Sequence, residues 1–129
     1  MKRLFLFLLP VMMLGLTACG HQTTIEETTA TRYKLYPTFN MWTFLKLDTK
    51  LGVITQVQFS LNDDNEFETP LGSINLEGES KAGRFELYPT TNNWTFILLD
   101  GETGAAYHVQ WNQDASKRGI MPIPNISNL

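Results

Sequence analysis

The chain has 129 residues, of which 13 are acidic and 10 basic, and it contains a single cysteine. A formal net charge of −3 argues against nucleic acid as a partner, because that partner demands a basic face. One cysteine forms no disulfide within the chain, so a folded domain of this length must be held together by its core.

Residues 1–18 have the three parts of a secretory signal. Two basic residues open the segment, an apolar run occupies residues 4–16, and small residues then lead to Cys19. The run of about 13 residues is shorter than the roughly 20 that a membrane-spanning helix needs. The sequence therefore predicts a signal peptide over residues 1–18.

The end of this segment, Leu16-Thr17-Ala18-Cys19-Gly20, resembles the lipobox of bacterial lipoproteins. The resemblance implies cleavage before Cys19, a thioether-linked diacylglycerol on its sulfur, and acylation of the new amino group, for example by palmitate. Two or three acyl chains anchor a protein stably. Because Gly20 and not Asp follows the cysteine, the resemblance favours the outer membrane over the inner one. The alternative is an ordinary cleaved signal peptide that happens to contain a cysteine.

The mature chain consists of a short polar segment and one module written twice. Residues 19–31 are rich in threonine and lack periodicity, which is typical of a flexible tether. Residues 32–62 align without a gap with residues 84–114, at an offset of 52, with 14 identities in 31 positions. Beyond this stretch Pro70 falls on Pro122, Leu71 on Ile123 and Ile74 on Ile126. The predicted duplicated domain, 32–129, comprises repeat one, 32–83, and repeat two, 84–129.

Apolar residues in each repeat alternate with a period of two, which predicts strands and not helices. The first strand has Tyr33 and Leu35 on one buried face. A five-residue loop that begins with Asp and ends with Gly, Asp48 to Gly52 in repeat one, predicts a tight hairpin. The predicted strands of repeat one are 33–35, 42–47 and 53–60, with copies in repeat two, and weaker fourth strands are expected at 71–76 and 119–123, at sheet edges because they contain or adjoin proline.

These patterns predict an all-β protein made of two tandem antiparallel units of about 52 residues. We expect the units to pack with pseudo-twofold symmetry, as a small sandwich or flattened barrel. The Leu-Asp-x-x-x-Gly hairpin resembles that of a β-propeller blade, but two blades do not close a ring, so closure by oligomerisation is the alternative. The tandem Trp-Thr-Phe module also resembles that of short lipoproteins, a resemblance that implies no activity.

Aromatic and amide side chains are the candidate contacts for a protein or glycan partner. Tyr36 and Tyr88 fall out of step with the neighbouring buried leucines, so we expect them at the surface. Gln58 and Gln110 lie on the expected outer face of the third strand, and Trp111 is a further candidate stacking platform. The alternative is that the tryptophans fill the core and that the glutamines are merely exposed.

The remaining polar residues are interpreted as structural. Asp48 and Asp100 suit turn capping better than paired catalysis, and Arg32 and Arg84 suit cross-strand pairing with a carboxylate. The acidic stretch 63–68 lacks the spacing of a calcium loop. Two histidines and one cysteine are too few for a zinc site, so no catalytic residue, metal or cofactor is predicted.

Together these features predict a lipid-anchored, non-catalytic lipoprotein of the cell envelope that binds a protein or a glycan. A structural subunit that assembles with copies of itself is the alternative from a different class. A hydrolase that acts on an envelope polymer is a third, more remote hypothesis.

Overall fold

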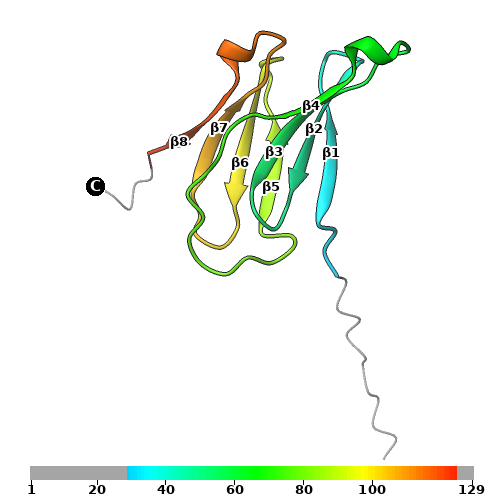
Figure 1. The fold of residues 1–129 in the computed structure, drawn as a ribbon. Coiled ribbons are helices and arrows are strands. Elements are labelled where there is room, and N and C mark those ends of the chain that lie inside the picture. The colour runs from blue at the N-terminus through cyan, green and yellow to red at the C-terminus, as the bar shows by residue number, and fades with distance from the viewer. Residues whose placement is uncertain (1–28, 125–129) are drawn as a thin grey trace, which may run out of the picture.

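The computed structural model describes residues 29–124 (Figure 1). The predicted signal peptide, Cys19 and most of the predicted tether therefore lie outside the described residues. The only helical elements of the described part are two single turns of 3-10 helix. Neither is long and apolar enough to cross a membrane.

Each repeat folds into one open four-stranded antiparallel sheet, with the strands in chain order (Figure 1). This arrangement confirms the predicted all-β fold of two similar units. The first sheet contains β1 (Tyr33–Pro37), β2 (Thr43–Asp48), β3 (Val53–Gln58) and β4 (Phe67–Pro70). The second sheet contains β5 (Phe85–Pro89), β6 (Thr95–Asp100), β7 (Ala106–Gln110) and β8 (Gly119–Ile123). Single turns of 3-10 helix, η1 (Asp63–Asn65) and η2 (Ala115–Lys117), precede the last strand of each sheet.

The β2–β3 hairpin is closed by the aspartate and glycine that the sequence indicated. Asp48 Oδ1 accepts hydrogen bonds from the backbone amides of Lys50, at 2.9 Å, and Leu51, at 3.2 Å. Gly52 has a φ of +69°, a conformation that side chains with a Cβ rarely adopt. A Cβ at Gly52 would also lie 2.5 Å from Ile74 Cδ1, so this glycine lets the chain after β4 pass close to the hairpin.

The fourth strand of the first sheet lies earlier than predicted. The structure places it at 67–70, whereas 71–76 has no regular structure; in the second sheet the strand at 119–123 is confirmed. Beyond Pro70 the amide of Leu71 still donates a hydrogen bond to the carbonyl oxygen of Ile54, at 3.0 Å, before the chain leaves the sheet. The following linker, residues 71–83, runs along the second sheet and turns below its strands before entering β5 (Figure 1). Both fourth strands, β4 and β8, are sheet edges, as expected from their prolines.

One hydrophobic core joins the two sheets, and this packing forms the expected small sandwich. Successive residues of a strand point to opposite faces, so each sheet commits only one face to this core. The buried residues come from both sheets and from the start of the linker: Leu45, Leu47, Ile54, Leu71, Phe85, Leu87, Phe96, Leu98, Val109 and Trp111.

The four faces of the two sheets are named here after one residue each, following the strand registers. The Leu45 face of the first sheet carries Tyr36, Thr43, Leu45, Leu47, Ile54 and Gln56. Its repeat equivalent, the Ile97 face of the second sheet, carries Tyr88, Thr95, Ile97, Leu99, Ala106 and His108. The Phe44 face of the first sheet carries Tyr33, Leu35, Phe44, Lys46, Thr55 and Val57. Its equivalent, the Phe96 face of the second sheet, carries Phe85, Leu87, Phe96, Leu98, Tyr107 and Val109.

The two sheets contribute non-equivalent faces to the core. Leu45 is fully buried, whereas its equivalent Ile97 is only half-buried. Phe96 is buried, whereas its equivalent Phe44 is half-buried. The Leu45 face therefore packs on the Phe96 face, and the Phe44 and Ile97 faces remain outside. A pseudo-twofold axis would bury equivalent faces, so that detail of the prediction is corrected: the units stack front to back.

Candidate functional site

The Phe44 face is a surface in the first sheet although the same repeat positions are core in the second. Tyr33 and Leu35 are 52% and 61% exposed, whereas their equivalents Phe85 and Leu87 are 1% and 2% exposed. The prediction that the first strand of each repeat has a buried apolar face is thus right for β5 and wrong for β1. The first sheet consequently presents apolar side chains to solvent.

An aromatic cluster forms one end of the Phe44 face. The ring centroid of Phe59 lies 5.2 Å from that of Trp42 and 6.1 Å from that of Phe44. Phe59 is 41% exposed and Trp42 is half-buried. Aromatic rings that are packed together but still reach solvent provide a large and rigid contact area for a partner.

In the equivalent aromatic cluster of the second sheet, Trp111 is covered by the first unit, whereas Trp94 is 36% exposed. Phe39, in the β1–β2 loop, places its ring centroid 4.8 Å from that of Trp94 and 5.4 Å from that of Trp111. Trp111 is fully buried, and its Nε1 donates a hydrogen bond to the carbonyl oxygen of Asn93 at 3.1 Å. The main difference between the two clusters is therefore that a neighbour covers Trp111, whereas its equivalent Phe59 is 41% exposed.

The middle of the Phe44 face is polar. Lys46 Nζ forms an ion pair with Glu68, and Thr55 Oγ1 donates a hydrogen bond to Glu68 Oε1 at 2.9 Å. The bond from Lys46 lowers the pKa of Glu68 below its ordinary value. A hollow of about 340 Å³ lies beside this group and is also lined by Tyr33 and Arg32. The face thus combines an apolar strand edge, an aromatic end and a polar hollow.

The arginine at this hollow forms the cross-strand pair that the sequence predicted. Arg32 Nε and Nη2 donate to Asp48 Oδ2 at 3.2 Å and 2.9 Å. The Arg32 side chain is 47% exposed, and its Nη1 has no hydrogen-bond partner within residues 29–124. This guanidinium group therefore keeps donors free toward solvent.

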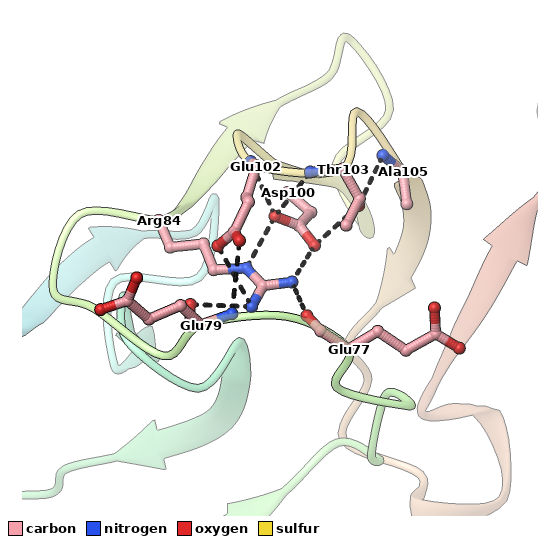
Figure 2. A network of polar contacts seen from close by, with 7 residues as sticks. All are labelled: Glu77, Glu79, Arg84, Asp100, Glu102, Thr103 and Ala105. Carbon is pink, nitrogen blue, oxygen red and sulfur yellow. Dashed lines mark hydrogen bonds and ion pairs between the residues drawn. The ribbon is translucent and has the colours of Figure 1, made fainter.

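The equivalent arginine of the second sheet is buried and has more partners (Figure 2). Arg84 Nε and Nη2 donate to Asp100 Oδ1 at 2.9 Å and Oδ2 at 2.7 Å. The same guanidinium also donates to the backbone carbonyl oxygen of Glu79, at 3.0 Å, and to that of Glu77. Arg84 thus binds an extended piece of the linker to the second sheet. Arg32 has the same carboxylate partner type but no such segment among the described residues.

The carboxylates of both pairs are fully engaged. For Asp48, burial raises the pKa, but hydrogen bonds from Arg32 and from the amides of Lys50 and Leu51 outweigh it and hold the pKa below its ordinary value. For Asp100, the bonds from Arg84 hold the pKa well below its ordinary value against the effect of burial. These aspartates cap turns and pair with arginines, as the sequence indicated.

The Asp100 carboxylate predicts a specific loss of stability in acid. Its folded-state pKa lies below the unfolded value of about 3.9, so its stabilising contribution is complete above that pH and is lost as pH falls toward the folded pKa. We expect urea unfolding of the Cys19→Ser chain to show a free energy that drops between about pH 5 and pH 2, and Asp100→Asn to flatten this drop.

Asp114→Asn is the control for this pH dependence. Asp114 also has a lowered pKa, but it is exposed and bonds mainly to Ser116, one turn along the chain. Its replacement should leave most of the acid slope in place. A slope that stays unchanged in Asp100→Asn would contradict the assignment of the acid sensitivity to the buried pair.

The structure divides the predicted contact residues between two environments. Tyr36 and Gln58 lie on the Leu45 face, where Tyr36 packs against the core and Gln58 is half-buried, so neither is on an outer face. Tyr88, 44% exposed, and Gln110, half-buried, lie on the uncovered Ile97 face. Trp111 is a core residue, which removes it from the surface that a partner reaches. Front-to-back stacking explains the split, because it gives the two copies of each position opposite surroundings.

Sequence reasoning missed Leu35 and Phe59 as surface residues, yet the sequence carried a signal for them. Where the buried Phe96 face has Leu98 and Tyr107, the Phe44 face has Lys46 and Thr55. Polar residues in the middle of one copy of an apolar face indicate which copy faces water. A comparison of the two repeats by face would have found this.

Within residues 29–124 there is no group of three or more histidine, cysteine, aspartate or glutamate side chains that could hold a metal ion. No family model, curated protein or solved structure matches this chain.

Proposed function

We propose that the chain is a non-catalytic interaction module, held in the bacterial cell envelope by lipid on Cys19, which docks a partner on the Phe44 face. One observation carries this proposal: repeat positions that are core in the second sheet are open to solvent in the first. Tyr33, Leu35 and Phe59 are between 41% and 61% exposed, and their equivalents are at most 2% exposed. Contiguous exposed apolar surface on a soluble domain marks interaction sites.

The chemistry of the face supports a protein partner. Aromatic and aliphatic side chains surround an ion pair, Lys46 with Glu68, and a partly free guanidinium, Arg32. Apolar anchors around a few oriented polar groups are the usual composition of a protein–protein interface. Binding of this kind needs no catalytic group. The two buried carboxylates, Asp48 and Asp100, are already engaged by arginines and turn amides.

Anchoring rests on the lipobox, and Cys19 lies outside the described residues. The anchor would hold the domain at the membrane on a tether of about a dozen residues, which leaves the Phe44 face free to meet a partner at the membrane surface. The outer membrane is the proposed site, because no aspartate follows Cys19. Replacement Cys19→Ser should move the chain from the membrane fraction to the soluble fraction.

Site-specific photo-crosslinking in living cells tests the docking surface. A photo-reactive amino acid at Leu35, 61% exposed on the Phe44 face, should give a discrete crosslinked product. The matched control is the same amino acid at Lys81, which is exposed in the linker and lies on neither sheet face. Equal labelling at Leu35 and Lys81, or no product at Leu35, would overturn the proposed docking surface.

A further inference from the structure

The two uncovered faces are the repeat equivalents of the two faces that form the core. The Phe44 face is equivalent to the Phe96 face, and the Ile97 face is equivalent to the Leu45 face. Inside one chain the Leu45 face already packs on the Phe96 face. Each end of the two-unit stack therefore carries the chemistry that recognises the other end.

The Ile97 face retains part of the composition of the face that it copies. Of its six positions named above, three are identical, Ile97 replaces Leu45, and Ala106 replaces the buried Ile54. At the edge of this face Ile123 is 41% exposed, whereas its equivalent Leu71 is 5% exposed between the sheets. The identical pairs are Tyr88 with Tyr36, Thr95 with Thr43, and Leu99 with Leu47.

The internal interface also accepts a polar side chain at its centre. Gln56 is fully buried on the Leu45 face, and its amide oxygen and nitrogen have no hydrogen-bond partner among the described residues. His108 occupies the equivalent position on the Ile97 face. A histidine there is therefore compatible with the same kind of packing.

We propose that a second copy of this chain is the partner, and that its Ile97 face covers the Phe44 face of the first copy in a head-to-tail repetition of the internal interface. This inference rests on the proposed function, because it names the occupant of the same docking surface. In this arrangement the Ile97 face of one copy and the Phe44 face of the next copy cover each other, so no further partner is needed to bury either face.

Association between copies should be weaker than packing within one chain. Lys46 and Glu68 lie on the Phe44 face where the Phe96 face has Leu98 and Ile120, and burying an ion pair carries a desolvation cost. Anchoring many copies to one membrane would raise their effective concentration and favour assembly. A head-to-tail contact then gives a closed ring if the rotation per copy closes and an open chain if it does not.

Paired cysteines distinguish this geometry from every other. Phe39 contacts Trp111 across the internal interface, at 5.4 Å between ring centroids. At an offset of 52, the contact between copies joins Thr91 of one copy to Phe59 of the next. The full-length variants Thr91→Cys and Phe59→Cys are expressed separately and together in bacteria, and isolated membranes are treated with a short bismaleimide.

The expected result is a crosslinked dimer only when both variants are present. Neither variant alone should react with itself, because a head-to-tail contact never brings two identical positions together. The double variant Thr91→Cys/Phe59→Cys should give a ladder or one larger ring band. Adding Ile97→Asp to the Thr91→Cys chain should abolish the dimer, since it places a charge in the apolar contact.

The other outcomes overturn the inference. Crosslinking of either variant with itself would show a twofold contact. A monomer in every mixture, with Leu35 still crosslinking to a different protein, would refute self-assembly and leave the proposed function standing. A monomer with no product at Leu35 would refute both. Reaction of the parent chain through Cys19 would instead contradict the lipid anchor.

Discussion

Replacing Arg84 with methionine should lower the free energy of unfolding by about 3–5 kcal/mol, the range measured when one partner of a buried ion pair is removed. The Arg84 side chain is 1% exposed and that of Asp100 is 4% exposed, so the variant leaves a buried carboxylate without its counter-charge. It also leaves the carbonyl oxygens of Glu77 and Glu79 without their donor. Methionine keeps much of the side-chain volume, which separates the loss of charge from a loss of packing.

Arg32→Met is the matched control, because it makes the same change at the equivalent repeat position. The Arg32 side chain is 47% exposed and contacts no linker carbonyl. The Asp48 side chain is only 9% exposed, but it keeps its hydrogen bonds from the amides of Lys50 and Leu51. Because the half-exposed Arg32 is easily replaced by water, this variant should lose clearly less free energy of unfolding than Arg84→Met. Urea unfolding of the two variants in a Cys19→Ser background, followed by tryptophan fluorescence, gives the comparison. Equal losses would contradict the difference in burial between the two arginines.

Most of the fold could be predicted from local patterns in the sequence. The period of two, the repeat offset and the Asp-Gly hairpins determine strands and turns through interactions within a few residues. Asp48 and Gly52 therefore have the roles that the sequence indicated. The fourth strand of the first sheet was misplaced because Ile74 and Leu76, which suggested it, pack against the core from the irregular linker and not from a strand.

The packing of the two units was harder to predict from the sequence, because each sheet has two similar apolar faces and either one could have been buried in the core. Both faces of β2 and of β6 carry apolar residues, so burial could not be assigned from one copy alone. The substitution of Lys46 for Leu98 marks the exposed copy only when the two repeats are compared face by face. The candidate site follows from that packing and not from any motif. For this reason Leu35 became a candidate only in the structure.

Replacing the equivalent leucine of each unit with alanine tests the front-to-back stacking directly. Leu87→Ala should lower the free energy of unfolding by about 2–5 kcal/mol, the usual cost of removing a buried leucine side chain. Leu35→Ala, at the equivalent position, should cost about 0.5 kcal/mol or less, as surface substitutions do. The two leucines are 2% and 61% exposed.

The comparison is informative because the residue type and the strand position are the same in both variants. Leu87 and Leu35 lie on edge strands of the same length, and Leu87 pairs with Leu98 where Leu35 pairs with Lys46. Urea unfolding of the dilute Cys19→Ser chain measures the monomer. Pseudo-twofold packing would make the two losses similar, so similar losses would contradict front-to-back stacking. If copies stack as proposed, Leu35 becomes an interface residue in the membrane, and Leu35→Ala should weaken the crosslink between copies while leaving the monomer stable.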